Sequence, residues 1–176
     1  FNPEFPDQNV RSETVYDAAS DAIAAIDNAD VITRTYFDAL HRPQTVVQNL
    51  VGQTIGDPTA PTRIPATPDE NIRTDTVYGS RGEVVRAIDA LEHATVTCYD
   101  GLGRTVKTIV NPSVSDPCGS YTPAPDTDLD LITTTVYDAV GNRLSSPDPK
   151  NCTGTFDNES EIACAHVSTA VTSEHS

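Results

Sequence analysis

The sequence predicts an all-β fold, a repetitive antiparallel meander or ribbon of about three units of about 60 residues with proline-rich crossovers. A Thr-Val-Tyr segment begins at Thr14, Thr76 and Thr135, so that its copies are close to 60 residues apart. A related aromatic–aspartate element follows each copy by about 20 residues. Both elements lie in runs rich in Thr, Val, Ile and Tyr, which favour strands, and short turns with Gly and Asp separate the runs.

The composition fits thin sheets better than a thick core. Hydrophobic residues make up 37% of the 176 residues and aromatic residues 6%, whereas soluble domains are typically about 45–50% apolar. The formal net charge of −15 disfavours nucleic acid as a partner, because a phosphate-binding protein needs clustered Lys and Arg. It also disfavours anionic membranes, and no apolar run approaches the roughly 20 residues that a membrane-spanning helix needs.

Each unit is expected to contain four short strands joined by turns. In the second unit, β-branched residues and turn residues place the strands at 71–78, 83–88, 94–99 and 104–110. The short gaps between neighbouring strands imply antiparallel pairing. The alanine-rich segment 17–27 is the best helical candidate, but it aligns with strand segments of the other units, and we therefore expect strand there.

Proline-rich stretches separate the units. Residues 56–70 and 111–126 each contain several prolines, which lack an amide donor and are excluded from central strands. We expect both stretches to be surface crossovers. They divide the chain into 1–55 (first unit with an extended N-terminal arm), 56–117 (crossover and second unit) and 118–176 (crossover, third unit and tail).

The aromatic–aspartate elements share a pattern: Tyr or Phe, Asp, two or three small residues, then Gly followed by Arg or Asn. The clearest copies are Tyr99-Asp100-Gly101-Leu102-Gly103-Arg104 and Tyr137-Asp138-Ala139-Val140-Gly141-Asn142-Arg143-Leu144. This pattern resembles the YD-repeat family, also called RHS repeats, and the copies cover most of the chain. The residues assigned to the motif are Tyr16, Asp17, Phe37, Asp38, Tyr78, Tyr99, Asp100, Gly103, Arg104, Tyr137, Asp138, Gly141, Arg143, Phe156 and Asp157.

The resemblance implies a long, twisted β-ribbon. In the family, such ribbons build large hollow shells of secreted or surface proteins of bacteria, and parts of some animal adhesion receptors. The residue types themselves give each motif position a structural role. We expect Tyr to pack against the next hairpin, Asp to bind downstream backbone and start the turn, Gly to take a positive φ, and Arg to pair back with Asp.

The four cysteines, Cys98, Cys118, Cys152 and Cys164, show no Cys-x-x-Cys pair, which disfavours a zinc site. Two disulfides in an oxidising compartment fit better, with free thiols as the alternative. Of the three connectivities, Cys98–Cys118 with Cys152–Cys164 is preferred, because both bonds close short local loops. Glycans are further candidate partners, since two N-glycosylation sequons begin at Asn151 and Asn158.

Residues suited to chemistry are few. Asp126, Asp128 and Asp130 place carboxylates at alternate positions, which makes them weak candidates for a calcium loop, against the alternative of a solvated strand entrance. The four histidines are scattered along the sequence, which also lacks phosphate-loop, nucleophile-elbow and dinucleotide motifs. We therefore expect no enzyme activity, no catalytic residues and no cofactor.

The leading functional hypothesis is a structural subunit of an extracellular filament or surface fibre, assembled head-to-tail through terminal β-edges or the arm 1–7. Its partner would then be a second copy of the chain. The alternative is a fragment of a larger secreted YD-repeat shell or adhesin that binds carbohydrate or a cell-surface partner. Both hypotheses place the chain outside or on the surface of a bacterial cell, as a processed mature form or a piece of a longer protein.

Overall fold

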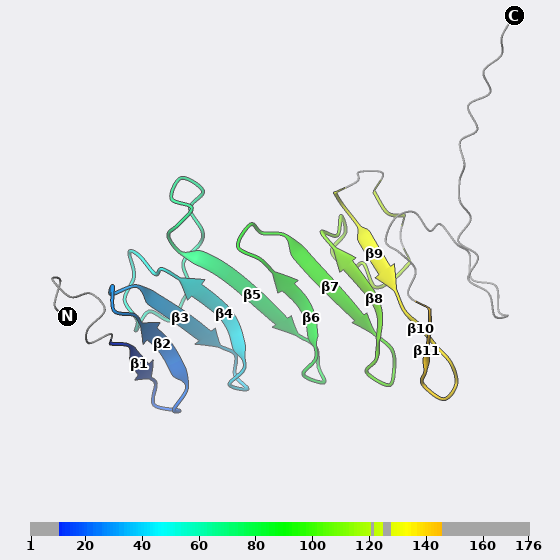
Figure 1. The fold of residues 1–176 in the computed structure, drawn as a ribbon, viewed down its shortest axis with the longest axis horizontal. Coiled ribbons are helices and arrows are strands. Elements are labelled where there is room, and N and C mark those ends of the chain that lie inside the picture. The colour runs from blue at the N-terminus through cyan, green and yellow to red at the C-terminus, as the bar shows by residue number, and fades with distance from the viewer. Residues whose placement is uncertain (1–10, 121, 125–127, 146–176) are drawn as a thin grey trace, which may run out of the picture. The chain divides into compact units, whose positions relative to one another are not determined.

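The computed structural model describes residues 11–120, 122–124 and 128–145, and within these ranges it contains β-strands and no helix (Figure 1). The all-β prediction is therefore confirmed. The strands are β1 (Glu13–Tyr16), β2 (Ala22–Ile26), β3 (Ile32–Phe37), β4 (Pro43–Gln48), β5 (Ile72–Tyr78), β6 (Val84–Ile88), β7 (Ala94–Tyr99), β8 (Thr105–Val110), β9 (Leu131–Thr134), β10 (Val136–Tyr137) and β11 (Arg143–Ser145). The same ranges hold no helix that is long and apolar enough to cross a membrane.

The strands pair in chain order. One nine-stranded antiparallel sheet runs from β1 to β9, and β10 and β11 form a separate two-stranded sheet (Figure 1). This arrangement is the predicted meander, and strands β5 to β8 lie within one residue of their predicted bounds. The chain divides into two compact units, residues 1–95 and 96–176. The division into three repeat units stays a prediction.

The two faces of the sheet in the first unit differ in charge. Strands β1 to β6 place all their charged side chains on one face, namely Glu13, Arg34, Arg73, Asp75 and Arg86. The opposite face, which we call the threonine face, has the cross-strand rows Thr14–Ala25–Thr33, Thr35–Val46–Thr74 and Thr76–Ala87. Successive side chains of a strand point to opposite faces of the sheet. The sequence Ile-Thr-Arg-Thr-Tyr in β3 therefore places its arginine on one face and its two threonines on the other.

Each unit buries only a small cluster of side chains. In the first unit, Val47 is fully buried, and Arg34 on the charged face is only 7% exposed. The guanidinium of Arg34 donates to the carbonyl of Ile23 at 2.7 Å and lies 4.6 Å from the ring centroid of Tyr36. The core of the second unit consists of Val96, Cys98 and Ile109, with Val106 and Ile132 packed against it. Both clusters agree with the thin sheet that the composition predicts.

Matching residue pairs close the two crossovers at their base. The first crossover, between β4 and β5, lies between Asn49 and Asn71, and the second, between β8 and β9, lies between Asn111 and Asp130. In each pair, the amide of the second residue donates to the carbonyl of the first, at 2.9 and 3.0 Å. All four residues have a left-handed φ of 50° to 54°, which Asn and Asp tolerate better than other side chains. The base of each crossover is therefore fixed although the crossovers differ in sequence.

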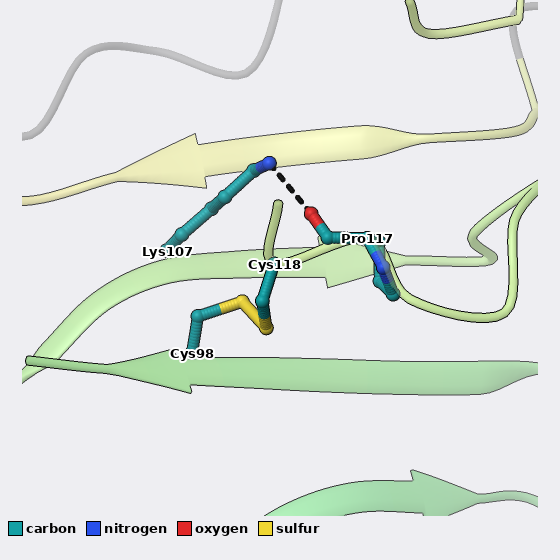
Figure 2. The surroundings of a disulfide bond; sticks show 4 residues. All are labelled: Cys98, Lys107, Pro117 and Cys118. Atoms are coloured by element: carbon teal, nitrogen blue, oxygen red, sulfur yellow. Dashed lines mark hydrogen bonds between the residues drawn. A yellow bond between two sulfur atoms is a disulfide. The ribbon is translucent and has the colours of Figure 1, made fainter. Parts of the chain in front are cut away.

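The second crossover is also covalently tied to the sheet (Figure 2). A disulfide joins Cys98 in β7 to Cys118 in the crossover, as the sequence predicts. Beside it, the Lys107 ammonium donates to the carbonyl of Pro117 at 2.7 Å, and Pro117 is fully buried. Burial lowers the pKa of Lys107, although the nearby Asp130 carboxylate opposes this effect. Two different bonds thus hold this crossover against one face of the second unit.

Removing the disulfide with Cys98→Ala and Cys118→Ala should lower the free energy of unfolding by about 3 kcal/mol, because the bond closes a loop of roughly 20 residues and so restricts the unfolded chain. Urea denaturation followed by circular dichroism measures the loss. The matched control carries Cys152→Ala and Cys164→Ala, whose predicted bond lies outside the described residues. An unfolding midpoint that stays unchanged in the first variant would contradict a stabilising role of the bond.

Candidate functional site: hairpin turns and arginine–tyrosine junctions

The hairpin turns repeat one hydrogen-bond pattern. In six of the described turns an aspartate comes first. Its amide donates to the carbonyl of the fifth residue, and its carbonyl accepts from the amide of the fourth, at 2.9 to 3.1 Å. Its carboxylate also accepts from the amides of the third and fifth residues, at 2.7 to 3.0 Å. The six aspartates are Asp17, Asp27, Asp38, Asp89, Asp100 and Asp138. This is the expected turn-starting role of Asp.

The fourth residue of each turn has a left-handed backbone. Gly103 and Gly141 take this position with φ of 81° and 91°, as the motif predicts. In the third turn His41 stands there with φ of 59°, a conformation that costs a side-chain residue roughly 1–2 kcal/mol. The imidazole Nδ1 of His41 lies 2.7 Å from a carboxylate oxygen of Asp21, and this hydrogen bond raises the pKa of His41. The contact joins the first turn, at 17–21, to the third turn, at 38–42.

In two turns the fifth residue is an arginine that folds back onto the aspartate. The guanidinium Nε of Arg42 donates to Asp38 at 2.7 Å, and Arg104 binds Asp100 at the same distance. The side-chain hydrogen bond from Arg42 lowers the pKa of Asp38. The backbone amide of Arg104, followed by its side chain, lowers the pKa of Asp100. Both aspartates are therefore held ionised, and each guanidinium is held in one orientation.

Each of these arginines also lies on a tyrosine from the strand beyond the following crossover. The Arg42 guanidinium carbon is 4.2 Å from the ring centroid of Tyr78, and the Arg104 carbon is 4.4 Å from that of Tyr137. The tyrosine hydroxyls donate to the carbonyls of the residues that follow the arginines, Pro43 at 2.9 Å and Thr105 at 3.1 Å. We call each set of aspartate, arginine and tyrosine an arginine–tyrosine junction.

The junctions correct one expectation. We expected the motif tyrosine to pack against the next hairpin, but Tyr78 and Tyr137 pack against the preceding one. The reason is geometric. Tyr78 ends β5, which pairs with β4, the outer strand of the preceding hairpin. Tyr137 ends β10, which follows β9 along the chain, and β9 pairs with β8, the outer strand of its preceding hairpin. Each junction thus connects the hairpin before a crossover to a strand after it, whereas the sequence alone indicates only an interruption of the sheet there.

The turn at 79–83 lacks the aspartate, and the carboxylate of Glu83 takes the place of the missing aspartate carboxylate. Gly79 opens this turn, and the carboxylate of Glu83 at the fifth position accepts from the amide of Arg81 at 3.0 Å. The amide of Glu83 itself, ahead of the other donors, lowers the pKa of this carboxyl. A Cβ atom at Gly79 would lie 2.8 Å from the Glu83 carboxyl carbon. The glycine therefore leaves the space that the glutamate occupies.

The last described turn keeps the aspartate but not the arginine. Asn142 stands at the fifth position, and its side-chain amide donates to Asp138 at 2.9 Å. This hydrogen bond lowers the pKa of Asp138. The motif residue Arg143 follows one position later and pairs in register with Tyr137. The turn is therefore closed in the usual way but presents no guanidinium at the position of Arg42 and Arg104.

The other candidate residues are not brought together. The carboxylate of Asp130 accepts from the amide and hydroxyl of Ser113 and from the amide of Ala124, so it closes the second crossover. Asp128 contributes a backbone carbonyl to the same loop. No three His, Cys, Asp or Glu side chains in the described ranges form a group that could hold a metal. The candidates outside these ranges are Asp126, Asn151, Cys152, Phe156, Asp157, Asn158 and Cys164.

The segment Phe37-Asp38-Ala39-Leu40-His41-Arg42 matches the motif with His41 in place of the glycine, but Arg42 was left out of the residues assigned to the motif. It follows Asp38 at the same spacing as Arg104 follows Asp100, and it makes the same hydrogen bond. The asparagine pairs at the crossovers were also missed. Their signal is positional, because Asn49 and Asn111 follow equivalent strands at the same distance.

A double-mutant cycle tests the junction. Arg104→Ala combined with Tyr137→Leu should show a coupling free energy of about 1 kcal/mol, the size expected of a partly exposed guanidinium on an aromatic ring. Urea denaturation of the four proteins measures it. As a control, Arg11→Ala combined with Tyr137→Leu should be additive, because Arg11 binds its neighbour Glu13. A coupling near zero for the first pair would show that the stacking does not stabilise the fold.

A charge exchange tests the turn at 79–83. Gly79→Asp alone should lower the free energy of unfolding by about 1–3 kcal/mol, because its Cβ would lie 2.8 Å from the Glu83 carboxylate and 2.9 Å from Val85 Cγ1. Adding Glu83→Arg should recover part of this loss, since it removes the carboxylate and recreates the pairing of Asp38 with Arg42, while the contact with Val85 remains. Thermal or urea unfolding compares the three proteins. If the double variant is no more stable than Gly79→Asp, the two residues are not exchangeable in the proposed way.

No family model matches the chain, and no curated protein matches it. Among solved structures, the chain is similar to part of a TccC3 mutant of the Photorhabdus luminescens Tc holotoxin pore, with a TM-score of 0.51 and 16% identity over 78% of this chain. It is also similar to part of the crystal structure of TcdB2-TccC3-TEV, with a TM-score of 0.52 and 17% identity over 83% of this chain. The chain spans only 5% and 6% of the length of these two proteins. The likeness establishes a shared fold.

Proposed function

We propose that this chain is a segment of a larger secreted YD-repeat protein, where it serves as structural sheet material in an enclosing wall and performs no catalysis. The observation that carries the proposal is the repetition of the arginine–tyrosine junction. The charged groups of each junction bind one another, as Asp38 binds Arg42. This pairing is suited to a structural role in the sheet. The fold likeness to chains of which the matched part is only 5% and 6% supports the role of a segment.

The disulfide supports a location outside the cytoplasm. Cys98 and Cys118 are bonded, and such bonds persist in oxidising compartments. A chain with a net charge of −15 is also well suited to remain dispersed in water. We therefore infer an extracellular or cell-surface location, and the similar Tc toxin chain from Photorhabdus luminescens supports a bacterial source.

The competing hypothesis is a head-to-tail filament of identical chains. One observation favours the filament: β1 is an edge strand of the described sheet and pairs with β2 only. Unpaired strand edges are templates for addition of another strand. The arm 1–7, which this hypothesis uses as a second contact, lies outside the described residues.

Size-exclusion chromatography with light scattering, followed by negative-stain imaging of the same sample, separates the two hypotheses. A wall segment should elute as a monomer of 18.8 kDa and form no fibres at moderate concentration. A variant without residues 1–7 is the control and should behave in the same way. Fibres that form from the full chain and disappear with the deletion would contradict the segment proposal and support the filament.

A further inference from the structure

The beginning of the chain repeats a strand that lies inside the sheet. Residues 9–16 read Asn-Val-Arg-Ser-Glu-Thr-Val-Tyr, and residues 71–78 read Asn-Ile-Arg-Thr-Asp-Thr-Val-Tyr. The three differences, Val for Ile, Ser for Thr and Glu for Asp, each change the side chain by a single carbon. Strands β1 and β5, which lie in these two segments, therefore carry the same groups in the same order.

In β5 these groups bind the preceding hairpin. β5 pairs in register with β4, and Thr45 of β4 donates its hydroxyl to Asp75 at 2.6 Å. Arg73 binds the same carboxylate at 2.8 Å and donates to a carbonyl of the first crossover at 3.3 Å. Tyr78 lies under Arg42 in the first arginine–tyrosine junction. The edge of β5 that faces β4 thus binds the preceding hairpin and its crossover.

In β1 and the residues just before it the same groups are present, but among the described residues no hairpin covers them. Arg11 binds Glu13 at 3.0 Å, which repeats the pairing of Arg73 with Asp75. The side chains of Arg11 and Glu13 are 81% and 52% exposed, whereas those of Arg73 and Asp75 are 31% and 21% exposed. Tyr16 is 62% exposed, and no arginine stacks on its ring in the part of the chain that the structure describes.

From this comparison we infer that the free edge of β1, with Glu13 and Tyr16, is a docking site for one further hairpin of the same repeat type. The hairpin has a turn that begins with Asp and ends with Arg, as in 38–42, and a threonine three residues after the arginine, as at Thr45. Its arginine stacks on Tyr16, and its threonine donates to Glu13. Sequence outside these 176 residues supplies it, so the inference rests on the proposed role as a segment.

The arginine content of the chain argues against the chain itself as the occupant. Every arginine lies between Arg11 and Arg143, so residues 1–10 and 146–176 contain none. Arg42 and Arg104 are already stacked in their own junctions. A second copy that docked by its last described turn would present Asn142 in place of the required arginine. The edge of β1 is therefore complementary to a different hairpin.

A fusion protein tests the inference. Residues 31–70, which contain β3, β4 and the first crossover, are placed directly before Asn9 of the complete remaining chain, so that Glu70 precedes an asparagine as it does naturally. Tetranitromethane nitrates exposed tyrosines, and the tryptic peptide 12–34 contains Tyr16 as its single tyrosine. We expect nitration of Tyr16 to fall severalfold in the fusion, to the level of Tyr78 in peptide 74–81.

The matched control is the same fusion with Arg42→Ala in the added copy only, which should restore nitration of Tyr16 while the added strands stay protected in hydrogen exchange. Three results would overturn the inference. These are unchanged nitration in the fusion, added strands that exchange freely, and protection of Tyr16 that survives the loss of the added arginine.

A dilution series of the unfused chain distinguishes this inference from the proposed function. Protection of Tyr16 that increases with protein concentration would identify a second copy as the occupant and would overturn the inference. Fibres without a change at Tyr16 would instead contradict the segment proposal alone, because the edge of β1 would still be free to accept the added hairpin.

Discussion

The guanidinium group held between an aspartate and a tyrosine is the interaction on which the sheet depends. A meander of short strands with small cores has few apolar contacts to connect one hairpin to the next strand. Arg42 and Arg104 make that connection, because each binds the aspartate of its own turn and the ring of a tyrosine beyond a crossover. The arginine must be planar and always charged to do both, and lysine offers neither the fork nor the stacking plane.

A second constraint acts at the crossovers. Backbone groups at the ends of β4 and β8 need partners, since an unpaired buried amide or carbonyl costs free energy. The pairs Asn49 with Asn71 and Asn111 with Asp130 supply those partners in the same geometry. The residues between them are then free to differ, and only the second crossover carries a disulfide. The two crossovers therefore share the geometry of their ends but differ in the loop between them.

Much of this fold is readable in the sequence, and the remainder depends on contacts between distant residues. Local patterns placed β5 to β8 within a residue and identified the aspartate turns, because strand propensity and turn chemistry act over a few positions. The packing of Tyr78 on the preceding hairpin, and the use of Glu83 in the space left by Gly79, are settled by pairing across the sheet. No local pattern encodes the direction in which a strand-end tyrosine turns.

The threonine face of the first unit has an electrostatic consequence. Its rows, such as Thr35–Val46–Thr74, contain no ionisable side chain, although the whole chain has a net charge of −15. The charges of strands β1 to β6 are on the other face, where Arg34 and Asp75 lie, and the remaining charges of this unit are in the turns, in the first crossover and before β1. Anything that touches the threonine face meets hydroxyl and methyl groups, so added salt should change its attachment little, while contacts at the turn tips should weaken as ionic strength rises.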